Sequence, residues 1–65
     1  MNPQLSRRVA LIMMTSAVRA LDVDRHIAFV TEVSRAESFE DLPIWVSDII
    51  TEGEQERAAA LAGGD

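Results

Sequence analysis

The most apolar stretch of the chain, Val9–Leu21 (VALIMMTSAVRAL), limits what a chain of 65 residues can fold into. It predicts one helix over residues 3–21, because Asn2 can cap a helix and Pro3 suits its first position. Apolar side chains would cover roughly 260° of this helix, whereas a surface helix buries a stripe of about 100°. Such a helix needs neighbours on more than one side.

The size of the chain allows one domain, which we assign to residues 1–62. Domains below about 70–80 residues rarely gain more than ~3–5 kcal/mol from one core, and disulfides, metals or oligomerisation supply the rest. The chain has no cysteine and one histidine, which excludes disulfides, thiolate zinc sites and His-rich metal sites. We therefore expect a homo-oligomer, or docking onto a larger protein.

A second amphipathic helix is predicted over residues 24–36, with Asp22 or Asp24 as its cap. Its link to the first helix is only two or three residues long, which favours an antiparallel helical hairpin. The apolar residues fall within about half of its circumference and are expected to face the core. They are Val23, Ile27, Phe29, Val30, Val33 and Ala36.

A third helix is predicted over residues 42–52, after a short turn at 38–41 and with Pro43 in its first turn. The following stretch, Glu54–Ala62, has strong helix propensity and either extends this helix or frays. Gly53 either ends the helix or allows a neighbour to approach closely. Residues 63–65 are expected to be disordered. The apolar face of the third helix comprises Leu42, Trp45, Val46, Ile49 and Ile50.

These elements predict an all-α fold: a small three-helix protein with an antiparallel hairpin and a third helix packed across it. The two other helices cannot cover all of the first one, so we expect Leu11, Met14 and Val18 to stay exposed and to drive self-association. The predicted self-association interface is Leu11, Met14, Val18 and Leu21. A candidate partner hot spot is formed by Phe39, Ile44 and Trp45, since tryptophan is enriched at hot spots. Alternatively, Trp45 only anchors the third helix on the hairpin.

The sequence offers little for catalysis or metal binding. His26 has Asp22 four residues before it, but a catalytic pair also needs a third group and a pocket. Glu52 and Glu56 share one side of a helix but lack the loop carbonyls and glycine of a calcium loop. We therefore expect no enzyme, no metal site and no cofactor.

Charge is unevenly distributed along the chain. Residues 1–35 carry five arginines against three acids, and residues 36–65 carry one arginine against eight acids. The two halves could therefore attract each other within a chain or between chains. A small dimeric DNA-binding regulator of the helix-turn-helix kind, using Arg7, Arg8, Arg19 and Arg25, is the alternative function. The third helix presents few groove-reading side chains, so nucleic acid is the weaker prediction.

A targeting signal is the competing interpretation of the N-terminal region. Ser6-Arg7-Arg8 followed by Val9–Val18 has the layout of a secretory signal. Cleavage would leave about 45 residues without a cysteine, too few for most independent folds. Thr15, Ser16 and Arg19 interrupt the run, which disfavours a membrane span. We expect a cytoplasmic protein-interaction module, an accessory or inhibitory factor or a small subunit of a larger assembly, such as phages and mobile elements encode.

Overall fold

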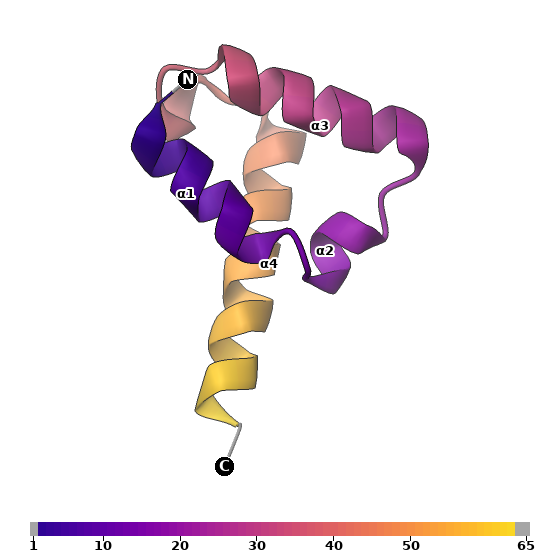
Figure 1. The fold of residues 1–65 in the computed structure, drawn as a ribbon, viewed down its shortest axis with the longest axis vertical. Coiled ribbons are helices and arrows are strands. Elements are labelled where there is room, and N and C mark those ends of the chain that lie inside the picture. Colours follow the sequence, from indigo (N-terminus) through magenta and orange to yellow (C-terminus); the bar gives the residue numbers. More distant parts are fainter. Residues whose placement is uncertain (1, 64–65) are drawn as a thin grey trace.

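A computed structural model describes residues 2–63, which fold into four α-helices and one 3₁₀ turn (Figure 1). The all-α expectation is confirmed for these residues. The elements are α1 (Pro3–Ile12), α2 (Ser16–Arg19), α3 (Val23–Arg35), the 3₁₀ turn η1 (Phe39–Asp41) and α4 (Ile44–Ala62). The predicted single helix over residues 3–21 is wrong, because the chain leaves the helix after Ile12 and begins α2 at Ser16.

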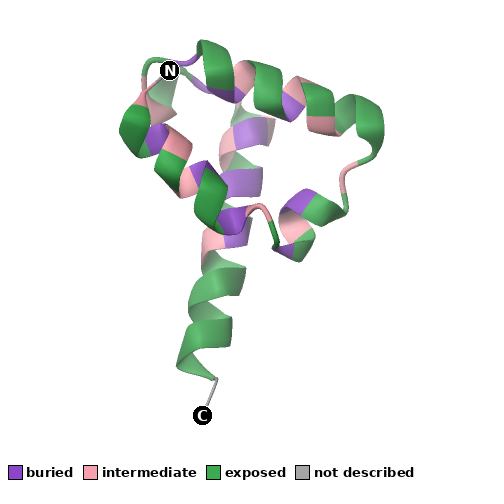
Figure 2. Ribbon diagram, in the orientation of Figure 1, coloured by how far each residue is buried: buried purple, intermediate pink, exposed green. Residues whose placement is uncertain are grey.

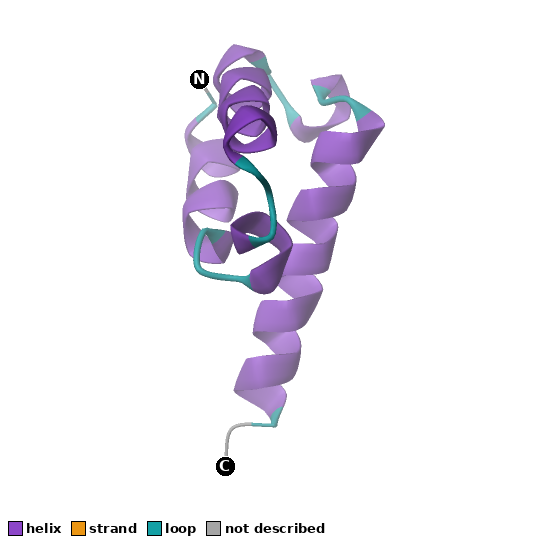
Figure 3. Cartoon of the chain, turned by 90° about the vertical axis from the view of Figure 1, so that its right-hand side faces the viewer, coloured by secondary structure: helices purple, strands orange, loops and turns teal. Residues whose placement is uncertain are grey.

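The longest helix, α4, organises the fold. It stands on one side of α1, α2 and α3 and packs most extensively against α2 and α1 (Figures 1 and 3). The C-terminal half of α4 continues beyond the other helices and is exposed (Figure 2). The described chain therefore has an elongated outline, with principal extents of 38 × 25 × 17 Å.

The hydrophobic core lies between the first half of α4 and the other three helices (Figure 2). Each helix contributes at least one fully or almost fully buried side chain, as burial of one apolar stripe per helix requires. The apolar face predicted for the third helix is confirmed, although Trp45 is only half-buried. The largest fully buried side chains are Ile12 from α1, Val18 from α2, Phe29 from α3, and Val46 and Ile50 from α4.

The break between α1 and α2 lies against Gly53 of α4. A Cβ atom placed on Gly53 would lie 2.9 Å from the Ile12 Cβ and 3.0 Å from the Thr15 Oγ1. Thr15 is itself buried, and its hydroxyl donates a 2.6 Å hydrogen bond to the carbonyl of Ile12. Gly53 therefore allows close approach, one of its two predicted roles, and does not end the helix.

The break also changes the arrangement of the helices. Because α1 has only ten residues, it does not form the predicted hairpin of two long helices. Instead, the N-terminus of α1 meets the segment after α3 (Figure 1), where the Asn2 Nδ2 donates a 2.7 Å hydrogen bond to the carbonyl of Glu37. The short helix α2 packs against α4 and places Val18 in the core.

Most of the predicted helix ends are confirmed. The Asn2 Oδ1 accepts hydrogen bonds from the backbone N–H groups of Gln4 and Leu5, and Asp22 caps α3. The turn at 38–41 is present as η1, but the Ser38 side chain makes no capping hydrogen bond. α4 begins at Ile44, so the predicted start at residue 42 with Pro43 in the first turn is wrong, and Pro43 is the N-cap. The helix extends to Ala62, one of the two predicted outcomes for this stretch. Of the predicted disordered tail, Gly63 closes α4 in a turn, and residues 64–65 lie outside the described residues.

Candidate protein-interaction surface

One side of α3 is apolar and exposed. Val23, Ile27 and Val30 follow the helical spacing that places side chains on one side, and 74%, 60% and 43% of their surfaces are exposed. We call these three residues the α3 apolar face. They were predicted to lie in the core, but only Phe29, Val33 and Ala36 are buried there.

The reason for this difference is the width of the apolar arc on α3. Apolar residues occupy about half of its circumference, and a surface helix normally buries a stripe of about 100°. The structure buries the part of the arc centred on Phe29 and leaves the adjoining part exposed. This excess width was the signal in the sequence that could have identified the α3 apolar face.

The α3 apolar face continues into a groove between α1 and α3. The α1 side of the groove includes the exposed Ala10 and the half-buried Met13, and the α3 side includes Val30. Both rims are mainly aliphatic, so the groove adds apolar surface to α3. Its lining residues are Ser6, Val9, Ala10, Met13, Val30, Val33 and Ser34.

The self-association interface predicted on the first helix is divided by the break after Ile12. Leu11 is 50% and Met14 is 79% exposed, as expected. The expectation that Val18 stays exposed is wrong, since α2 turns this side chain into the core, and Leu21 also packs against the core. The surplus apolar arc that predicted this interface assumed a continuous helix, and the break takes Val18 and Leu21 out of it.

The candidate hot spot is also only partly exposed. Ile44 is exposed, whereas Phe39 and Trp45 are half-buried and pack against the core. The Arg8 guanidinium lies 4.4 Å from the centre of the Phe39 ring. Trp45 lines a shallow hollow with Asp24, Arg25 and Ala28 on α3. These contacts support the predicted anchoring role of Trp45, and contact with a partner stays a prediction.

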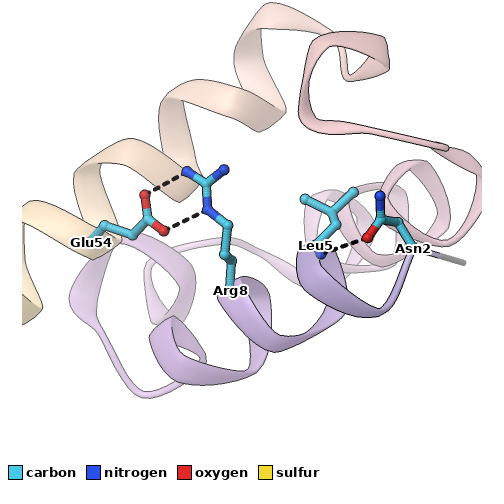
Figure 4. Close-up of polar contacts among 4 residues, drawn as sticks. All are labelled: Asn2, Leu5, Arg8 and Glu54. Atoms are coloured by element: carbon cyan, nitrogen blue, oxygen red, sulfur yellow. Dashed lines mark hydrogen bonds and ion pairs between the residues drawn. The ribbon is translucent and has the colours of Figure 1, made fainter.

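An ion pair between Arg8 and Glu54, the residue after Gly53, joins α1 to α4 (Figure 4). The Arg8 Nε and Nη2 each donate a 2.8 Å hydrogen bond to a carboxylate oxygen of Glu54. The hydrogen bond from Arg8 lowers the pKa of Glu54 and, in return, raises the pKa of Arg8. Both side chains remain about two-fifths exposed, so solvent weakens the pair. The attraction between the basic and acidic halves thus operates within the chain at this point.

The carboxylate and the backbone carbonyl of Asp22 both accept hydrogen bonds from the first turns of α3. The Asp22 carboxylate accepts a 2.8 Å hydrogen bond from the backbone N–H of Arg25, and its carbonyl accepts one from the N–H of His26. Asp22 therefore caps α3. Among the described residues, its carboxylate makes no hydrogen bond or ion pair with the imidazole of His26. Within residues 2–63, no group of three or more His, Asp or Glu side chains is arranged to hold a metal ion.

The arginines of the DNA-binding alternative lie on three helices. Arg7 and Arg8 belong to α1, Arg19 to α2 and Arg25 to α3. Arg8 is engaged by Glu54, and the Arg25 guanidinium lies 5.9 Å from the Trp45 ring centre. Among the described helices, none is both long and apolar enough to cross a membrane.

Comparisons with protein-family models, with curated proteins and with solved structures found no match for this chain.

Proposed function

We propose that this chain is a non-enzymatic helical protein-interaction module that binds another protein chain through the α3 apolar face and the adjoining groove. Its role would be that of an accessory or inhibitory factor, or of a small subunit in a larger assembly. The observation that carries this proposal is the exposure of Val23, Ile27 and Val30 along one side of a single helix. Exposed aliphatic residues are common singly, but adjoining ones beside a groove are typical of contact surfaces.

Covering the α3 apolar face contributes free energy to association. Burying a fully exposed valine or isoleucine side chain contributes about 1.5–3 kcal/mol. The three residues are already partly covered, so each contributes less than that. Met13 and Ala10 in the groove add to the total when a partner covers them. An apolar helix lying along α3 would bury all of these groups, as in helix-in-groove recognition.

A capture experiment with two matched variants tests the proposal. The tagged protein is compared with I27E and L61E, because both replace an exposed aliphatic residue with glutamate but only Ile27 belongs to the α3 apolar face. We expect proteins captured by the wild type, or cross-linked wild-type chains, to be lost with I27E and retained with L61E. Equal capture by wild type and I27E would contradict the proposal.

The DNA-binding alternative predicts a different measurement. Binding through arginine–phosphate contacts weakens steeply as salt concentration rises. Fluorescence anisotropy with a labelled duplex at low and physiological salt would detect it. The protein-interaction proposal predicts no duplex binding near physiological salt. Salt-sensitive binding that R7A and R19A abolish would favour the DNA-binding regulator instead.

A further inference from the structure

We propose that the partner of the α3 apolar face is a second copy of this chain, with the two α3 helices packed antiparallel. This inference rests on the proposed function and specifies its partner. It is argued from the charges that border the α3 apolar face. These charges pair between the two copies in the antiparallel orientation and find no opposite charge in the parallel one.

The outer edge of the α3 apolar face carries two charges of opposite sign. Asp24 lies in the first turn of α3 and Arg35 in the last turn, eleven residues later. Eleven residues are about three turns, so both side chains project from the same edge, about 16 Å apart along the axis. Thr31 lies between them on this edge, and all three residues are exposed.

Both charges are available to a partner. Among the described residues, the ion pair that the structure contains joins Arg8 to Glu54 and involves neither Asp24 nor Arg35. The separation of the two charges exceeds the reach of a direct contact within one helix. Each end of α3 therefore offers one exposed charge to an oppositely charged side chain of a partner.

An antiparallel second copy provides both partners at once. Reversing the direction of the second α3 places its Arg35 beside Asp24 of the first copy, and its Asp24 beside Arg35. A two-fold axis relates the two contacts, so one ion pair implies the other. In a parallel pair, the two-fold axis runs along the helices and puts the charged edges of the two copies on opposite sides of the contact, so neither Asp24 nor Arg35 meets an opposite charge.

The same register aligns the apolar residues. Val23, Ile27, Val30 and Ser34 follow one another at intervals of four, three and four residues, which is the spacing of helices that pack side by side. In the register that sets each Ile27 opposite the partner's Val30 and each Val23 opposite its Ser34, Asp24 lies within two residues of the partner's Arg35, about 3 Å along the axis. Apolar contacts therefore lie at the centre and ion pairs at the edge, as in typical interfaces.

Charge reversal followed by mixing tests this arrangement. D24R puts two positive charges on the edge and R35D puts two negative charges there, so each variant repels its own copies. We expect light scattering to show self-association of the wild type, and about tenfold or greater weakening in each variant. An equimolar mixture of D24R and R35D should associate again, because each chain then meets opposite charges. Mixing cannot repair a misfolded helix, so recovery reports pairing between chains.

A second pair of variants covers the case in which a reversed charge unfolds α3. D24N and R35Q remove the charges without reversing them, and circular dichroism measures whether the protein keeps the helix content of the wild type. We expect both to associate more weakly than the wild type and with less dependence on salt. Association of D24N and R35Q equal to that of the wild type would overturn the proposal.

The outcomes separate the second copy from the proposed function. If folded D24R and R35D, mixed or separate, have the same mass as wild type at every concentration, the second-copy proposal is overturned. The proposed function then stands only if capture of another protein is lost with I27E and retained with L61E. If I27E alters neither capture nor mass, both proposals fail.

Discussion

Glu56 of α4 caps the N-terminus of α2: its Oε2 accepts a 2.7 Å hydrogen bond from the backbone N–H of Ser16. The N-cap residue of α2, Thr15, makes no capping hydrogen bond, because its hydroxyl donates to the carbonyl of Ile12. A carboxylate from a distant helix thus performs a task that usually belongs to a local side chain.

The first prediction concerns this cap. Replacing Glu56 with alanine should lower the free energy of unfolding by about 0.5–1 kcal/mol, at the lower end of measured cap effects, because the contact is exposed. E56Q should lose less, since its amide oxygen can still accept the hydrogen bond. Urea denaturation followed by circular dichroism measures both. E52A removes an exposed carboxylate one turn earlier and is the control, and an equal loss in E52A and E56A would contradict the capping role.

The second prediction concerns Gly53. An alanine normally stabilises a helix interior by about 1 kcal/mol relative to glycine. G53A should instead destabilise the fold, because its Cβ would lie 2.9 Å from the Ile12 Cβ and overpacking costs about 1–3 kcal/mol. The same urea titration measures the change, with Q55A at an exposed position as the control for helix propensity. A G53A protein more stable than wild type would show that α1 does not approach α4 as described.

The third prediction is a pH dependence at the Arg8–Glu54 pair. Because the hydrogen bond from Arg8 lowers the pKa of Glu54, the pair stabilises the fold fully above the ordinary glutamate pKa of about 4.3. That stabilisation is lost as the pH falls through the lower pKa of the folded state. The pair is partly exposed, so its contribution should not exceed about 1 kcal/mol.

Comparison with E54Q isolates this effect from the other carboxylates. The difference in free energy of unfolding between wild type and E54Q should be constant near neutral pH and shrink on acidification. A difference that does not change with pH, or one that grows in acid, would contradict the assigned direction of the pKa.

The fourth prediction separates two residues that the sequence placed on one surface. V18E puts a charge into the fully buried position on α2 and should unfold a domain whose core supplies only ~3–5 kcal/mol. M14E changes a residue that is 79% exposed and should alter the free energy of unfolding by no more than about 0.5 kcal/mol. Thermal unfolding followed by circular dichroism distinguishes them. A V18E protein that stays folded would contradict the burial of Val18.

Local signals in the sequence were sufficient for part of this fold. Asn2 was identified as a cap, Asp22 was one of two candidate caps, and the turn before α4 was placed correctly, because capping and turn formation depend on neighbouring residues. The apolar face of α4 followed from its helical spacing. These features need no knowledge of distant contacts.

The break at Met13–Thr15 could not be predicted in the same way. No glycine or proline interrupts the stretch, and its local pattern favours a continuous helix. The features that accompany the break come from about forty residues away. They are the missing side chain of Gly53, which lets Ile12 and Thr15 approach α4, and the carboxylate of Glu56. Thr15 and Ser16, residue types that favour caps over helix interiors, were the available local hint.

The same break explains why the exposed apolar surface differs from the predicted one. A continuous helix would have left apolar residues exposed on α1, and Val18 would have been among them. In the folded chain Val18 is buried, and Val23 and Ile27 on α3 are exposed instead. Which half of the wide apolar arc on α3 is covered depends on how α1 and α4 pack against it, and periodicity alone does not contain that information.

Cysteine cross-linking tests the antiparallel pairing of α3 most directly. The chain contains no cysteine, so introduced pairs give no background. Under mild oxidation, a mixture of V23C and S34C chains should form mixed disulfide dimers, and V23C alone should form few. Dominant V23C homodimers, or a mixture that cross-links no more than a Q55C control on α4, would contradict the account.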